Sequence, residues 1–208
     1  MGWYLYLRAR ILLMNESPQT IVFTRSQIQS AVAGVSQEVA AWLQSKHSKS
    51  LHLISVMEGA KPFARDLVAN LGKILPALEV KVHEIRIKGT DGKSLLETRE
   101  WQGSGLDPAA LDSAPVLLVD DLVDSGKTLQ MLKEKVLALG VLEVKTAVLT
   151  RKFGDASGPV DFVGFDLNLD HEALAQKGSK DYWLFGYGMD LAGQYRDLDY
   201  VGWVEIKI

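Results

Sequence analysis

Residues Val116–Thr128 read VLLVDDLVDSGKT, and this stretch decides the fold. Its first four residues form a continuous apolar run, which is typical of a central parallel strand buried on both faces. Two aspartates follow, then a short polar turn, and then a helical pattern that includes Leu129 and Leu132. Open parallel sheets bind their ligands beyond the carboxyl ends of the strands. The stretch therefore predicts a strand, a ligand-binding turn and a helix, in that order.

The turn Ser125–Thr128 offers what a phosphate group needs. Ser125 and Thr128 supply hydroxyls, and Gly126 leaves room for a ligand to approach the N–H groups at a helix N-terminus. The preceding carboxylates would repel a phosphate, so we expect them to serve ribose hydroxyls, Mg²⁺ or a base nitrogen. A Walker A loop is excluded, because Asp121 stands where that motif needs a glycine.

Helical and strand patterns alternate along the rest of the chain, which predicts a mostly parallel sheet flanked by helices. One amphipathic helix is expected after Thr24, whose capping-box partner is Gln27. Another is expected at Pro62, because proline is favoured in a first helical turn. The polar stretch 88–105 is expected to be a mobile loop. The expected strands run over residues 52–57, 80–87, 116–119, 144–149 and 162–165.

The composition is that of one ordinary globular domain. Of the 208 residues, 47% are hydrophobic and 24% are charged, which excludes disordered and collagen-like classes. The formal net charge of -3 argues against broad binding to nucleic acid or to a membrane surface. The apolar stretch 1–14 is too short to cross a bilayer. The chain has no cysteine, which excludes disulfides and thiolate metal sites and fits a cytoplasmic location.

The stretch VLLVDDLVDSGKT resembles the phosphoribosyl-pyrophosphate signature of type I phosphoribosyltransferases. DFVGFDL at 161–167 and GYGMDLAGQYRDLDYVG at 186–202 resemble the C-terminal part of the hypoxanthine-guanine branch, and ISVMEGAKPF at 54–63 resembles its pyrophosphate loop. The resemblance implies an α/β fold with a twisted, mostly parallel sheet, flanking helices and a small hood. We therefore expect a single domain over 1–208, with a core over about 24–160 and a hood formed by about 161–208 and the N-terminal segment.

The same resemblance implies an activity. The 5-phosphoribosyl group would move from phosphoribosyl pyrophosphate to N9 of a 6-oxopurine, hypoxanthine or guanine, with Mg²⁺ as cofactor. The products would be a purine nucleoside monophosphate and pyrophosphate, as in purine salvage, and the enzyme would be a cytoplasmic homodimer or homotetramer. Two alternatives stay open: a regulator that binds phosphoribosyl pyrophosphate with weak catalysis, and a transferase for another base, such as xanthine or a pyrimidine.

Roles carry over position by position from the resemblance. Asp124 becomes the acid/base that faces N7 of the purine, and Asp120 and Asp121 bind the ribose hydroxyls. The cradle of the 5′-phosphate consists of Ser125, Gly126, Lys127 and Thr128. The base would lie between Leu122 and Trp183 and be read by the backbone of Leu184. The pyrophosphate residues would be Glu58, Gly59 and Arg196, and the Mg²⁺ residues Asp190, Asp120 and Asp121.

The chain departs from the family pattern in its pyrophosphate loop. Family loops usually carry a lysine where this chain has Glu58, which reverses the charge beside a polyanion. The family loop also implies a strained peptide between Met57 and Glu58, with only the backbone N–H of Glu58 turned to the ligand. The departure puts catalytic efficiency in doubt more than the fold.

A second departure concerns the base. The family lysine that reads the purine 6-oxygen has no equivalent in the stretch 158–160, which is Gly-Pro-Val here, and residues 168–182 contain an insertion. The donor to that oxygen would then be Lys180, brought in by the insertion, or the backbone around Leu184.

Overall fold

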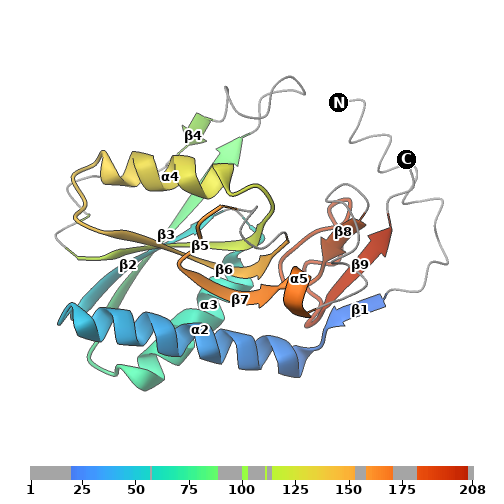
Figure 1. Ribbon diagram of the computed structural model, residues 1–208, viewed down its shortest axis with the longest axis horizontal. Coiled ribbons are helices and arrows are strands. Elements are labelled where there is room, and N and C mark those ends of the chain that lie inside the picture. Colours follow the sequence, from blue (N-terminus) through green and yellow to red (C-terminus); the bar gives the residue numbers. More distant parts are fainter. Residues whose placement is uncertain are drawn as a thin grey trace.

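The computed structural model describes residues 20–56, 58–88, 100–102, 111, 114–152, 158–170 and 182–205. In these ranges the strands form a large sheet in the order β4-β3-β2-β5-β6-β7 and a small sheet in the order β1-β9-β8. Figure 1 shows the small sheet beside one end of the large one. The sequence prediction of a mostly parallel sheet flanked by helices is confirmed.

The large sheet is parallel except at one edge. Strands β3, β2, β5, β6 and β7 run parallel to their neighbours, and β4 pairs antiparallel with β3. Val116 to Val119 of β5 are completely buried between β2 and β6, as the apolar run predicted. The bounds are β2 (Ser50–Val56), β3 (Glu79–Lys88), β4 (Glu100–Gln102), β5 (Val116–Val123), β6 (Val144–Arg151) and β7 (Phe162–Asp166).

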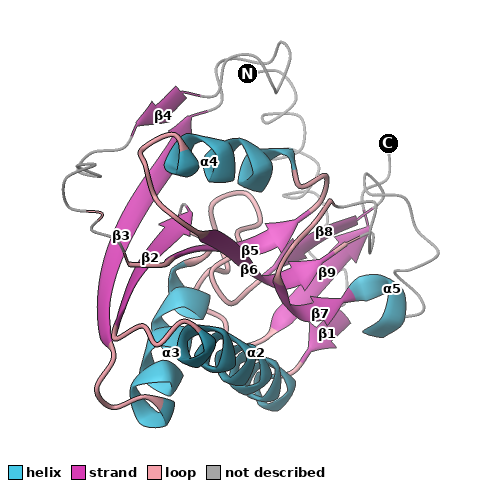
Figure 2. Ribbon diagram, turned by 60° about the vertical axis from the view of Figure 1, so that its left-hand side comes forward, coloured by secondary structure: helices cyan, strands magenta, loops and turns pink. Residues whose placement is uncertain are grey.

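Helices cover both faces of the large sheet (Figures 1 and 2). The long helix α2 (Arg25–Ser45) and helix α3 (Lys61–Ile74) lie together on one face, and α4 (Lys127–Leu137) lies on the other. The expected capping box at Thr24 and Gln27 is present, and Pro62 lies in the first turn of α3. The short helix α5 (Leu167–Asp170) follows β7. None of the helices in the described ranges has the length and apolar character that a bilayer crossing requires.

The small sheet joins the two ends of the described chain. Strand β1 (Thr20–Phe23) pairs with β9 (Val201–Glu205), which also pairs with β8 (Tyr182–Phe185), and both pairings are antiparallel. The ring of Phe23 stacks on Phe165 of β7, with 3.7 Å between the ring centroids, and so ties the small sheet to the large one. Because β7 belongs to the large sheet, the C-terminal part of the small sheet begins later in the chain than residue 161.

The prediction of a loop over 88–105 is wrong at two places. Residues 100–102 form β4, and Lys88 still belongs to β3, with which β4 pairs from Arg86↔Gln102 to Lys88↔Glu100. Without β4, strand β3 would be the edge of the large sheet and its outer backbone groups would be unpaired. The hydrogen bonds with β4 satisfy these groups, and they favour a strand here despite the polar composition of the stretch. Its other residues, 89–99 and 103–105, lie outside the described part of the chain.

Candidate active site

The predicted ligand-binding turn lies at the carboxyl end of β5. Asp120 and Asp121 are half-buried in the last part of the strand, and the exposed Asp124 opens the turn that leads into α4. Gly126 precedes the helix with a φ of 68°, a conformation that glycine adopts without strain. Gly126 has no side chain to cap α4, and the N-terminus of this helix carries the partial positive charge that favours an anion.

The carboxylate of Asp121 packs against the turn that follows β2. A Cβ atom at Gly59 would lie 1.8 Å from Oδ2 of Asp121, so only glycine fits at this position. Burial raises the pKa of the Asp121 carboxyl, while a hydrogen bond with Asp120 and the positive charge of Arg196 act in the opposite direction. The segments predicted to bind ribose and pyrophosphate are thus in direct contact.

The predicted pyrophosphate residue Arg196 is fixed by two acceptors in the segment after β8. Its guanidinium donates to the carbonyl of Gly188 at 2.5 Å and to Oδ1 of Asp190 at 2.6 Å. The other carboxylate oxygen of Asp190 accepts from the N–H of Gly193 at 2.8 Å. A guanidinium has five N–H donors, so these two contacts leave donors for an anion.

Trp183 is oriented by the same acidic residue. Its indole Nε1 donates to the backbone carbonyl of Asp190 at 2.6 Å, yet 41% of the residue is exposed. The ring is therefore held by its edge while a face stays open for stacking. Leu122 is half-buried in β5, and Leu184 is buried, with its backbone paired to Trp203 of β9.

The turn after β8 is strained, and it contacts the turn that follows β2. Gly186, Tyr187 and Gly188 have φ values of 92°, 48° and 98°, all in the left-handed region. A Cβ atom at Gly188 would lie 2.1 Å from the carbonyl oxygen of Gly59, so the two turns touch through their backbones. A tyrosine in this conformation costs free energy, and such outliers cluster at functional sites.

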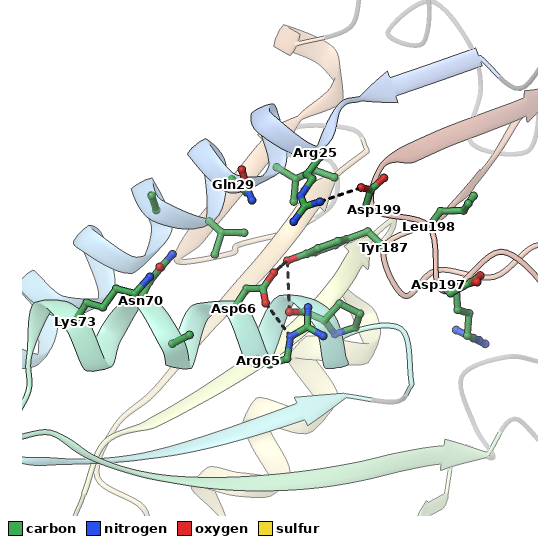
Figure 3. Close-up of a pocket in the computed structure, with 16 residues that line it drawn as sticks. Arg25, Gln29, Arg65, Asp66, Asn70, Lys73, Tyr187, Asp197, Leu198 and Asp199 are labelled. Atoms are coloured by element: carbon green, nitrogen blue, oxygen red, sulfur yellow. Dashed lines mark hydrogen bonds and ion pairs between the residues drawn. The ribbon is translucent and has the colours of Figure 1, made fainter.

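Tyr187 anchors this turn to α3, as Figure 3 shows. Its buried hydroxyl donates to the carboxylate of Asp66 at 2.7 Å, and burial together with that hydrogen bond raises the pKa of Tyr187. The pair lies in a cavity of about 850 Å³ between α2, α3 and the segment 196–199, where Arg25 and Asp199 form an ion pair. This cavity lies behind the candidate site and shares Arg196 with it.

Glu58, which stands where the family pattern has a lysine, forms an ion pair with Lys61. Its carboxylate lies 3.0 Å from the ammonium of Lys61, which also contacts Glu84 of β3 at 2.9 Å. Hydrogen bonds with these two carboxylates raise the pKa of Lys61. The charge reversal noted in the sequence is therefore offset within the turn itself. The predicted strain between Met57 and Glu58 lies outside the described residues, because Met57 is not among them.

Sequence reasoning missed Lys152, which follows β6. This lysine is only 5% exposed, its backbone N–H donates to the carbonyl of Val123, and burial lowers its pKa while the nearby charge of Asp124 raises it. Its Nζ lies 4.4 Å from the ring centroid of Tyr182. The stretch 158–160 does lack a lysine, and no local pattern marks Lys152, because its burial depends on the pairing of β5 with β6. The earlier candidate Lys180 lies outside the described residues.

The described residues contain no cluster of three His, Cys, Asp or Glu side chains that could hold a metal. They do contain the adjacent carboxylates of Asp120 and Asp121, and the backbone N–H of Asp121 donates to Oδ1 of Asp120 at 3.0 Å. Proteins usually bind Mg²⁺ through one or two carboxylates, water and substrate phosphates. This pair fits such a site. Both oxygens of Asp190 accept hydrogen bonds from Arg196 and Gly193.

Residues 24–174 match the family model of the phosphoribosyl transferase domain. Among curated proteins, the chain is 28% identical to the hypoxanthine-guanine phosphoribosyltransferase of Dictyostelium discoideum, over 88% of this chain and 93% of that protein. It is 27% identical to the enzyme of the same name from Bacillus subtilis, over 91% of this chain and 95% of that protein.

Solved structures give the same result for the fold. The hypoxanthine-guanine phosphoribosyl transferase of L. donovani superposes with a TM-score of 0.74 at 25% identity, covering 90% of this chain and all (100%) of that chain. The hypoxanthine phosphoribosyltransferase of Trypanosoma cruzi superposes with a TM-score of 0.71 at 22% identity, covering 91% of this chain and 98% of that chain.

Gly59→Ala is expected to displace Asp121 and to lower both stability and ligand binding, because the added methyl group cannot fit beside the carboxylate. We expect a loss of about 1–3 kcal/mol in the free energy of unfolding, measured by urea denaturation. Gly72→Ala in α3 is the matched control: nothing lies within 4 Å of its added Cβ atom. That change should be neutral or stabilising, because alanine favours a helix. Equal stability of the two variants would contradict the close contact.

Proposed function

The chain belongs to the phosphoribosyl transferase domain family, and we propose that it transfers the phosphoribosyl group of phosphoribosyl pyrophosphate to a 6-oxopurine, hypoxanthine or guanine. The observation that carries the proposal is the meeting of three segments at one sheet edge. The turn after β5, the turn after β2 and the segment after β8 join through Asp121, Gly59 and Gly188. They bring the N-terminus of α4, paired carboxylates and a fixed arginine together.

Each part of the donor substrate finds a matching group. The turn Ser125–Thr128 and the N-terminus of α4 would hold the 5′-phosphate, and Asp120 and Asp121 would accept hydrogen bonds from the ribose hydroxyls. Arg196 and the backbone N–H groups of the Glu58–Gly59 turn would bind the pyrophosphate and stabilise the charge that grows on it as the bond to the sugar breaks.

The acceptor base would stack between Leu122 and the open face of Trp183. Asp124 would take up the proton that the purine loses when its N9 bonds to the sugar. Lys152 would donate a hydrogen bond to the exocyclic oxygen, because its buried ammonium lies close enough to Asp124 to feel the charge of that residue, which is proposed to face the base. This proposal replaces Lys180 as the side-chain donor.

Mg²⁺ is part of the proposal, with Asp120 and Asp121 as the carboxylates that would hold it and Asp190 at the pyrophosphate end. Its chemistry would be to offset the negative charge of the substrate's phosphates. Self-association into a homodimer or homotetramer belongs to the same proposal, and light scattering of the purified protein tests it.

A regulator with weak catalysis is the less favoured reading. It rested on Glu58 and on the absent lysine. Glu58 is paired with Lys61, however, and Lys152 is a buried lysine near Asp124, where we propose that the base binds. Substrate binding without turnover would support this alternative.

Turnover with a panel of bases tests the proposed function. With phosphoribosyl pyrophosphate and Mg²⁺, we expect hypoxanthine or guanine to react faster than adenine. A buried donor that faces an amino group stays unpaired, at a cost of about 1–3 kcal/mol. Faster turnover of adenine or of a pyrimidine would contradict the base class and leave the phosphoribosyl site unaffected.

Asp124→Asn is expected to retain binding of phosphoribosyl pyrophosphate and to lower kcat by about 10²–10⁴-fold, the usual contribution of general acid–base catalysis. Steady-state kinetics and calorimetry measure the two effects. The exposed Asp197, whose side chain lies in the cavity behind the site, provides the matched control Asp197→Asn, which should leave kcat unchanged. A wild-type kcat for Asp124→Asn would remove this residue from the mechanism.

Lys152→Met is expected to lower kcat/KM for hypoxanthine about 10-fold or more, because it removes a charged donor while keeping a similar side-chain length. Affinity for phosphoribosyl pyrophosphate should change little. Lys145→Met is the matched control, since Lys145 lies at the other end of β6 and also contacts aromatic rings. If Lys152→Met left kcat/KM unchanged, the donor to the base would be the backbone around Leu184.

A further inference from the structure

The ammonium of Lys152 lies over an aromatic ring that neither the sequence motifs nor the proposed function uses. The distance from Nζ of Lys152 to the ring centroid of Tyr182 is 4.4 Å, well within the range of a cation–π interaction. Both residues are buried, with exposed fractions of 5% for Lys152 and 1% for Tyr182. A cation–π contact is strongest when it is shielded from water, as this one is.

A second aromatic ring and the pairing of β8 hold the Tyr182 ring in place. Tyr182 meets Trp203 of β9 edge to face, with ring centroids 6.3 Å apart and planes at 90°. Tyr182 opens β8, where it pairs with Glu205, so its backbone is also fixed by the small sheet. The platform under the ammonium is therefore rigid, and it belongs to the same strand as the base-stacking candidate Trp183.

The phenol hydroxyl does not explain why a tyrosine occupies this position. The hydroxyl is buried and has no hydrogen-bond partner among the described residues. Burial and the nearby charge of Asp124 raise the pKa of Tyr182 to about 12, so the phenol is neutral at physiological pH. An unpartnered buried hydroxyl is a cost, so the face of the ring is the part of this side chain that makes a favourable contact with Lys152.

We propose that Tyr182 is a positioning residue for base recognition: its ring face holds the Lys152 ammonium at the base end of the site. This inference rests on the proposed function and deepens it, because it names the element that aims the donor. A 6-oxopurine offers an oxygen acceptor to this ammonium, whereas a 6-aminopurine does not. Tyr182 would thus favour 6-oxopurines without touching the base itself.

Kinetics of a double-mutant cycle test the inference on the full-length protein. Tyr182→Leu, which removes the ring, is expected to lower kcat/KM for hypoxanthine by about 5- to 30-fold at saturating phosphoribosyl pyrophosphate. Tyr182→Phe, which keeps the ring, should stay within about twofold of the wild type, because the hydroxyl has no partner to lose among the described residues. In the Lys152→Met background, Tyr182→Leu should have little further effect.

Two kinetic results would overturn the inference. One is an equal loss from Tyr182→Leu in the wild-type and Lys152→Met backgrounds, since the tyrosine would then act through packing alone. The other is an equal loss from Tyr182→Phe and Tyr182→Leu, since the hydroxyl would then be the active group. A silent Lys152→Met would also overturn the inference, because Lys152 would then not act on the base. Failure of the proposed function looks different, since the wild type would show no turnover of any base.

NMR spectroscopy tests the contact between Lys152 and Tyr182 without any turnover. It therefore applies even if the wild type is inactive or if Tyr182→Leu folds poorly. In NMR spectra, the Hε protons of Lys152, identified by their loss in Lys152→Met, should show an upfield ring-current shift. Tyr182→Phe should keep that shift. A Lys152 signal at the ordinary lysine position in the folded wild-type protein would overturn the inference whatever the activity.

Discussion

The site depends on a close approach of backbones that only glycine allows. Asp121 of β5 can approach the turn after β2 because Gly59 has no side chain. The turn after β8 can approach the carbonyl oxygen of Gly59 because Gly188 has no side chain either. Any larger residue at these two positions would force the three segments apart. The contact therefore fixes how far the paired carboxylates, the turn after β2 and Arg196 stand from one another.

Such tight packing of polar groups requires that charges be matched locally. Asp121 is half-buried, and the positive charge of Arg196 opposes the rise that burial causes in the pKa of its carboxyl. Arg196 is in turn held by Asp190, and Glu58 of the neighbouring turn is held by Lys61. Each group that would face an anionic substrate is thus pre-oriented by a neighbour, which lowers the reorganisation that binding demands.

The sequence predicted what local patterns determine. The run Val116–Val119 indicated a central strand, and Thr24 with Gln27 indicated a helix start, because burial on both faces and a capping box leave local signatures. Strand β4 was missed because its pairing with β3 comes from tertiary contact. Lys152 was missed because its burial beside Asp124 depends on the pairing of β5 with β6, which no local pattern shows.

The register of the small sheet determines where Tyr182 and Trp183 lie. Side chains alternate along β8, so the buried Tyr182 and the exposed Trp183 point to opposite sides of the strand. A slip of one residue would exchange them and would leave Lys152 without its ring. The register is fixed where Phe185 pairs with Gly202, since a Cβ atom at Gly202 would lie 2.6 Å from Cζ of Phe185. Gly202 therefore determines which ring lies under the lysine and which ring stays exposed for the proposed stacking with the base.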